Sequence, residues 1–186
     1  MSLRLFVGIE LAGPAREAIL GIRERLVEVL SRQGVRFVRP EKLHITLAFL
    51  GQVDESAVEP LEAALDRLGD ARGHTMTTSD LGCFPDMRRP KVIWIGLEGD
   101  TSRLVELARC VTEAARPFAP EMDEKPFSAH LTLARINPGS REVGRVLQRI
   151  EVSPGRAELP VASFILFLSR PDGTYEALHE VRLSSS

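Results

Sequence analysis

Two short segments of the chain carry the same pair of side chains suited to acid–base chemistry. His44-Ile45-Thr46-Leu47 recurs as His130-Leu131-Thr132-Leu133, and nowhere else does a threonine stand two residues after a histidine. Histidine, with an ordinary pKa of ~6.5, can donate or accept a proton near neutral pH. A threonine hydroxyl can donate a hydrogen bond to an anionic oxygen. Two such pairs in one cleft could hold a phosphate and supply both a general base and a general acid, without a metal.

Both segments lie in short apolar runs, residues 43–50 and 131–136, which predict buried β-strands. Side chains alternate along a strand, so each histidine shares a face with its threonine, while the aliphatic residues between them take the other face. The proposed chemistry therefore requires two strands that are distant in the sequence to meet with their polar faces on the same side.

The remaining elements predict an α+β fold with antiparallel sheets. Apolar residues at three-and-four spacing predict helices after Pro14, Asp54 and Asp100 and a short one over 143–150. Further strands are expected over 3–11, 75–84, 91–97, 162–169 and 175–183, and Gly34 and Gly51 are expected to end the first helix and the first His-x-Thr strand.

The predicted order of strand, long helix, His-x-Thr strand, shorter helix and strand occurs twice. Val7-Gly8-Ile9-Glu10 also resembles Ile95-Gly96-Leu97-Glu98, which indicates an internal duplication. We therefore expect one domain over residues 1–186, made of two intertwined, pseudo-symmetric lobes around a central cleft. Each lobe would contribute one H-x-T-L strand, with helices on the outside.

Composition limits the class of protein. The 186 residues carry a net charge of −2 and are 44% hydrophobic, which is ordinary for a globular protein and does not suit extended binding of duplex nucleic acid. The two cysteines, Cys83 and Cys110, form no motif and indicate a reducing compartment. No leader-like start and no long apolar run is present. We expect a cytoplasmic protein.

The motif residues resemble those of the two-histidine (2H) phosphoesterases, and among them the bacterial RNA 2′,3′-cyclic phosphodiesterases, also called LigT, ThpR or 2′-5′ RNA ligase-like proteins. The similarity covers nearly the whole chain, in family order. The segments that carry it are Arg39-Pro40-Glu41-Lys42-Leu43-His44-Ile45-Thr46-Leu47, Phe49-Leu50-Gly51, Pro126-Phe127, His130-Leu131-Thr132-Leu133-Ala134-Arg135, Leu5-Phe6-Val7, Trp94 and Gly173-Thr174-Tyr175.

This resemblance implies a bilobal α+β fold that opens RNA 2′,3′-cyclic phosphate ends to 2′-phosphomonoesters with no metal and no other cofactor. It implies that His130 is the general base that activates water and that His44 is the general acid that protonates the departing O3′. Thr46, Thr132 and Arg135 would bind the phosphate, and Phe49 would pack on the terminal base.

Phe49 and Arg135 each follow their histidine by five residues. On a regular strand this odd offset turns a side chain to the opposite face, so both require a bend or a bulge to reach the site. Of the other candidates, Lys42 and Lys125 could add positive potential, Tyr175 could line the pocket, and the Asp86–Arg89 loop could touch RNA. His74 and His179 are expected to be structural, and no metal-binding motif is present.

Three alternative functions stay open at this point: 2′-5′ RNA ligation, an RNA-end binding module with incidental catalysis, and hydrolysis of a small cyclic nucleotide. The expected partners are RNA 3′ ends or nucleotides that carry a 2′,3′-cyclic phosphate. We expect neither a membrane nor an obligatory protein partner, and we expect a monomer.

Overall fold

The computed structural model describes residues 1–122, 125–138, 142–150 and 155–185. The helices in these ranges are α1 (Gly13–Leu30), α2 (Val58–Asp66), α3 (Thr101–Ala115) and α4 (Val143–Leu147). The strands are β1 (Ser2–Glu10), β2 (Val35–Phe37), β3 (His44–Asp54), β4 (His74–Phe84), β5 (Val92–Gly99), β6 (His130–Ile136), β7 (Glu158–Val161), β8 (Ser163–Ser169) and β9 (Tyr175–Arg182).

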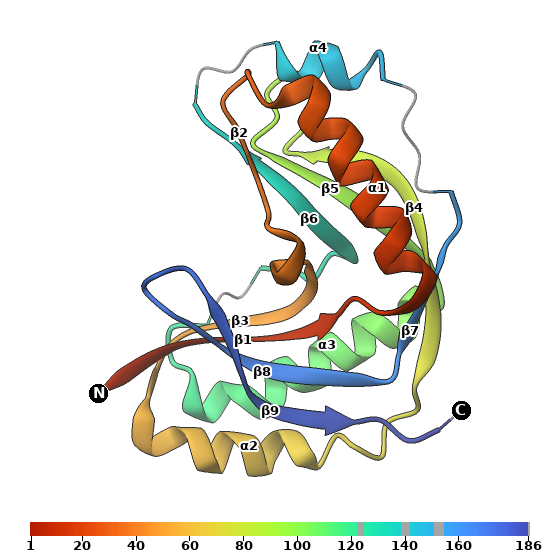
Figure 1. The fold of residues 1–186 in the computed structure, drawn as a ribbon. Coiled ribbons are helices and arrows are strands. Elements are labelled where there is room, and N and C mark those ends of the chain that lie inside the picture. Colours follow the sequence, from red (N-terminus) through yellow and green to blue (C-terminus); the bar gives the residue numbers. More distant parts are fainter. Residues whose placement is uncertain (123–124, 139–141, 151–154, 186) are drawn as a thin grey trace.

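These strands form two antiparallel sheets, which confirms the predicted α+β class (Figure 1). The four-stranded sheet has the order β3-β1-β8-β9, and the five-stranded sheet has the order β2-β6-β5-β4-β7. Each sheet thus pairs one His-x-Thr strand with the strand that opens the same half of the chain. The fourth strand of each half crosses over: β4 joins the five-stranded sheet, and β8 joins the four-stranded sheet.

The helices show the same exchange. Helix α1 follows β1 in the chain but packs against β7 and β2 of the five-stranded sheet, whereas α2 and α3 pack against β9 and β3 of the four-stranded sheet (Figure 1). Pro14 occupies the first turn of α1, where its missing N–H costs nothing. The Asp100 side chain caps α3 by accepting a hydrogen bond from the Arg103 backbone N–H. No helix among the described residues is long and apolar enough to cross a membrane.

Several predicted boundaries were wrong. Helix α1 ends at Leu30, and Gly34 lies four residues further on in the turn, with φ 68°. Strand β3 does not stop at Gly51 but continues to Asp54, because Gly51 takes φ 74° beside an extra residue in the ladder with β1. Strands β2 and β7 were not predicted as strands, because three or four residues are too short to show alternation. Both lie at sheet edges, where short strands are usual.

The internal repeat also has a different register from the one its sequence suggests. Gly8 stands opposite Thr46, whereas Gly96 stands opposite His130, so the two glycines do not occupy equivalent positions.

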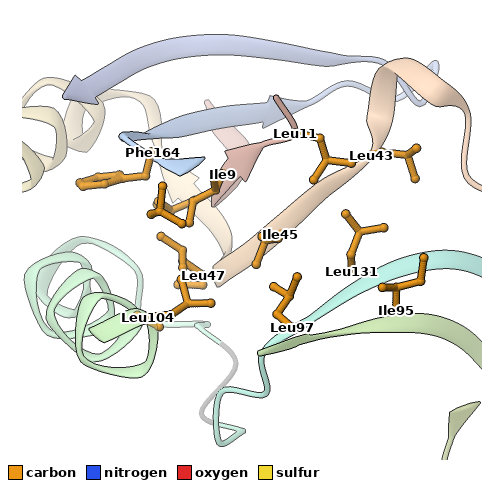
Figure 2. Packing of buried hydrophobic residues seen from close by; sticks show 14 of the residues in the cluster. Ile9, Leu11, Leu43, Ile45, Leu47, Ile95, Leu97, Leu104, Leu131 and Phe164 are labelled. Atoms are coloured by element: carbon orange, nitrogen blue, oxygen red, sulfur yellow. The ribbon is translucent and has the colours of Figure 1, made fainter. Parts of the chain in front are cut away.

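The apolar faces of both His-x-Thr strands belong to one core cluster. Figure 2 shows Ile45 and Leu47 of β3 in the same packed region as Leu131 of β6, together with Leu97 from the neighbouring strand β5. Ile45 and Leu131 are fully buried there. The core thus joins the two sheets directly beneath the two motifs.

Candidate active site

The two motifs lie on contacting strands and face away from the shared core. Strands β3 and β6 contact each other, and their aliphatic residues point into the cluster of Figure 2. Because side chains alternate, His44 and Thr46 point the other way from β3, and His130 and Thr132 do the same from β6. All four are half-buried, in contrast to the buried residues between them. The structure therefore brings the predicted pairs to the same side of the seam between the sheets.

Each imidazole is held by a carbonyl oxygen two residues before it. His44 Nδ1 lies 2.7 Å from the Lys42 carbonyl oxygen, and His130 Nδ1 lies 2.7 Å from the Ser128 carbonyl oxygen. A carbonyl oxygen can only accept, so Nδ1 carries the hydrogen in both rings. Nε2 is left as the atom that exchanges a proton, and at His44 it lies 2.9 Å from Thr46 Oγ1. Matching hydrogen bonds on two separate strands orient the two rings in the same way.

A β-bulge in each motif strand brings Phe49 and Arg135 onto the face of the histidines. Along β3, Thr46 opposes Gly8 and Ala48 opposes Val7, so one extra residue stands between Thr46 and Phe49. Along β6, Thr132 opposes Trp94 and Ala134 opposes Ile93, so Leu133 is the extra residue. Each bulge shifts the alternation by one, which is what the odd offset required. Phe49 is 48% exposed, and Arg135 is also exposed.

The His44 ring stands against an aromatic wall of the four-stranded sheet. Its centroid lies 4.8 Å from the Phe6 ring and 5.5 Å from the edge-on Tyr175 ring, and Phe167 stacks on Phe6 at 5.0 Å. Gly8 leaves room for this ring, since a Cβ there would lie 3.2 Å from His44 Cδ2. Neither Phe6 nor Phe167 was predicted as a site residue, because only the β1–β3 and β1–β8 pairing places them beside the motif.

Burial lowers the pKa of His44 from its ordinary value, and the hydrogen bond to the Lys42 carbonyl partly opposes this effect. Burial therefore favours the neutral form of the His44 ring. Positive charge lies close by, because Lys42 Nζ stands 4.7 Å from the Tyr175 ring centroid in a cation–π contact. Tyr175, which is 38% exposed, lines the pocket as predicted, and its ring also contacts the Lys42 ammonium group.

The His130 ring has its own aromatic supports on the five-stranded sheet. Phe84 meets it edge-on at 4.9 Å, and Trp94 lies 6.3 Å away between centroids. Trp94 in turn packs against Gly82 of β4, where an added Cβ would overlap its ring. Phe84 had no signal in the sequence, since its place depends on the β4–β5 register.

His44 lines a cavity of about 360 Å³ on the side of the four-stranded sheet. Its walls include Lys42, Phe167 and Tyr175, but not His130. This cavity is therefore only the half of the site that adjoins His44. His130 lies on the face of β6 and β5 that also carries Thr132 and Trp94.

The other candidates lie elsewhere or are structural. His179 Nε2 lies 2.6 Å from Asp66 Oδ1 and so ties β9 to the end of α2. His74 begins β4 opposite Val161, in the ladder with the edge strand β7. Asp86 accepts hydrogen bonds from the backbone N–H groups of Arg88 and Arg89 and shapes their loop. Lys125 is exposed just before β6.

Both cysteines are free, with Cys83 buried and Cys110 partly exposed. Among the described residues, no group of three or more histidine, cysteine or acidic side chains could hold a metal ion.

Comparison with known proteins gives a consistent picture. The family model of the LigT-like phosphoesterases matches residues 9–94. A protein of Archaeoglobus fulgidus named RNA 2′,3′-cyclic phosphodiesterase is 33% identical over 164 residues, which cover 88% of this chain and 89% of the relative. Among solved structures, Escherichia coli LigT complexed with 3′-AMP superposes with a TM-score of 0.77 at 27% identity, over 99% of each chain. The Thermus thermophilus protein TT0787 gives 0.79 at 26% identity, over 99% of this chain and all of that one.

Proposed function

Because this chain belongs to the LigT-like family of RNA 2′,3′-cyclic phosphodiesterases, we infer that it hydrolyses the 2′,3′-cyclic phosphate ends of RNA. The observation that carries the chemistry is the matched pair of imidazoles. Each is held at Nδ1 by a carbonyl oxygen and shares its strand face with a threonine, and at His44 the Nε2 atom lies 2.9 Å from the hydroxyl oxygen of that threonine. Two oriented proton carriers on contacting strands suit in-line displacement at phosphorus, which needs a base and an acid on opposite sides.

We propose that His130 Nε2 takes a proton from water as the water oxygen attacks phosphorus. The P–O3′ bond breaks, and His44 Nε2–H gives its proton to O3′. The product is a 2′-phosphomonoester with a free 3′-hydroxyl. His130 then returns its proton to solvent and His44 regains one, which resets both rings.

The remaining site residues have positioning roles in this proposal. The hydroxyls of Thr46 and Thr132 donate to the phosphate oxygens, and the exposed guanidinium of Arg135 binds the same group. Phe49 offers an exposed ring for the terminal base, and its centroid lies 6.3 Å from that of the buried Phe6 ring behind it.

The lowered pKa of His44 bears on its role as the acid. A general acid must be protonated when the substrate is bound, whereas burial favours the neutral ring. A bound phosphodiester anion acts in the opposite direction, because a nearby negative charge raises the pKa of an imidazole. The proposal therefore requires that binding of the anion restores the proton on His44.

We further propose that the reaction needs no metal and that the chain acts as a monomer, as one domain of two lobes, in the cytoplasm. Two free thiols fit a reducing compartment. Turnover should stay unchanged in excess EDTA; strong inhibition by the chelator would contradict the metal-free scheme.

The deciding experiment is end-group analysis after incubation with an oligonucleotide that ends in a 2′,3′-cyclic phosphate. We expect a 2′-phosphate from the wild-type protein and no turnover from His44→Ala or His130→Ala, with unchanged circular dichroism. His179→Ala serves as the matched control and should keep full activity. A 3′-phosphate product would reverse the assigned geometry. A ligated product from cyclic-phosphate and 5′-hydroxyl halves would favour the 2′-5′ ligase alternative.

A further inference from the structure

A pair of arginines faces the catalytic side of the five-stranded sheet at its edge. Arg36, in the middle of the edge strand β2, stands directly opposite Arg135 of β6. Residues directly opposite in an antiparallel ladder point to the same face of the sheet. Across β6, Arg135 in turn opposes Val92 of β5. Arg36 was not among the residues singled out from the sequence, because β2 itself was not predicted.

Strand β5 shows that this face is the catalytic one. Val92, Trp94 and Gly96 alternate regularly along β5 and oppose Arg135, Thr132 and His130 in that order. These partners therefore share one face of the sheet. The opposite face of β2 is occupied by α1, since Arg23 lies 5.9 Å from the Phe37 ring and donates a hydrogen bond to the Val38 carbonyl oxygen. Arg36 consequently points away from α1, toward the side of the histidines.

Neither arginine is neutralised by the part of the chain that the structure describes. Both are exposed, and neither forms an ion pair or a hydrogen bond with any described residue. Like charges placed directly opposite each other weaken a sheet. Edge strands do carry charged side chains that block pairing with other chains, but that role does not need a second arginine beside the first on the catalytic face. Anions bound by the two guanidinium groups would offset the repulsion.

The position of the pair indicates which anion this is. Val92 precedes Gly96 by four residues, so the Arg36–Arg135 row lies about 13 Å along the strand from the His130 row. A cyclic mononucleotide brings one phosphate, which the His-x-Thr pairs and Arg135 already bind in the proposed function. A second arginine beside Arg135 suits a substrate that carries a further phosphate next to the reacting one.

We propose that Arg36 binds the phosphodiester that joins the terminal nucleotide to the rest of the RNA strand, and that the enzyme therefore prefers an RNA end to a cyclic mononucleotide. This inference rests on the proposed function, since the reacting phosphate fixes where the next one lies. The guanidinium fork suits bidentate binding of a phosphate. The site thus selects for chain length and not for base.

The test compares kcat/KM on two substrates with the same terminal base: a tetranucleotide with a 2′,3′-cyclic phosphate and the nucleoside 2′,3′-cyclic monophosphate. For Arg36→Ala we expect roughly tenfold lower kcat/KM on the tetranucleotide and a change within about twofold on the mononucleotide. The slope of log kcat/KM against log salt should shrink by ~0.7 for the tetranucleotide. Arg36→Lys keeps the positive charge but loses the guanidinium fork, so its loss of kcat/KM on the tetranucleotide should be smaller than that of Arg36→Ala. Arg67→Ala, at the end of α2, is the control for loss of an exposed arginine.

An equal loss on both substrates, or no loss on the tetranucleotide, would overturn the proposal. So would a wild-type protein that shows no preference for the longer substrate. If the wild-type protein hydrolyses neither substrate, the proposed function fails separately. In that case the subsite is judged by binding of the 3′-phosphorylated tetranucleotide, which Arg36→Ala must still weaken about tenfold.

Discussion

Replacing Gly82 by alanine tests whether the aromatic support behind His130 controls catalysis. Gly82 on β4 opposes Trp94 on β5, and the indole packs closely against the glycine. An added Cβ would overlap Cη2 and Cζ2 of the indole and would lie 2.7 Å from Cε2. Ordinary carbon contacts are ~3.5–4.0 Å, so the ring must retreat by about 1 Å.

The indole has little room for that movement. Phe84 lies 5.1 Å from it between centroids, the His130 ring lies 6.3 Å away, and Thr132 is its direct partner on β6. Overpacking of this kind costs about 1–3 kcal/mol of unfolding free energy. For a chain of this size, each kcal/mol lowers Tm by about 2–4 °C. A displacement of about 1 Å in the groups that position the phosphate can reduce the rate about a hundredfold.

Three measurements follow the change in one variant. Trp94 is the sole tryptophan, so its emission spectrum reports the ring directly. We expect a shifted emission maximum, a lower Tm and about a hundredfold lower kcat/KM on a cyclic-phosphate substrate. Gly21→Ala is the matched control, because Gly21 lies in α1 with no atom within 4 Å of an added Cβ. The unfolding free energy of that variant should rise by about 0.5–1 kcal/mol, and its activity should be unchanged. Wild-type emission, Tm and turnover in Gly82→Ala would refute the reasoning.

Three further predictions concern pH, thiols and the base. Burial lowers the pKa of His44 below its ordinary 6.5, so the unfolded chain takes up that proton first as the pH falls. The unfolding free energy should therefore fall as the pH is lowered from 6.5 through the depressed pKa of the folded state. The fall should be smaller in His44→Asn. Identical denaturant unfolding curves of the wild-type protein at pH 7.5 and pH 5.5 would contradict this. Burial also raises the pKa of Cys83 to about 11, which leaves about a thousandth of it as thiolate at pH 8. A thiol reagent should thus label only Cys110 in the native protein, and Cys110→Ser should abolish that labelling; rapid labelling of Cys83 would refute its burial. Phe49→Ala should raise KM for a cyclic-phosphate oligonucleotide about tenfold with little change in kcat, because one exposed stacking surface is lost. An unchanged KM would exclude a contact between Phe49 and the base.

The spacing of apolar residues along the chain predicted much of the secondary structure. The apolar spacing from Ala15 to Leu30 predicted α1, and the Asp100 cap correctly marked the start of α3. The pairing of the strands could not be predicted from this spacing, because it joins segments that are far apart in the chain. Strand β8, near residue 165, lies beside β1, and β2 lies beside β6. No local pattern around Arg36 indicates its neighbour Arg135.

Residue types and spacing alone identify the groups that could do the chemistry and the local arrangement of each pair. Two His-x-Thr-Leu repeats in apolar runs require each imidazole and hydroxyl to share a strand face, because alternation along a strand is a property of the backbone. Which other side chains join them depends on how the strands pair. The bulges before Phe49 and Arg135 arise only from pairing with β1 and β5, and a shift of one residue turns a side chain to the opposite face. Register is set between strands, and so it is absent from any single segment of the chain.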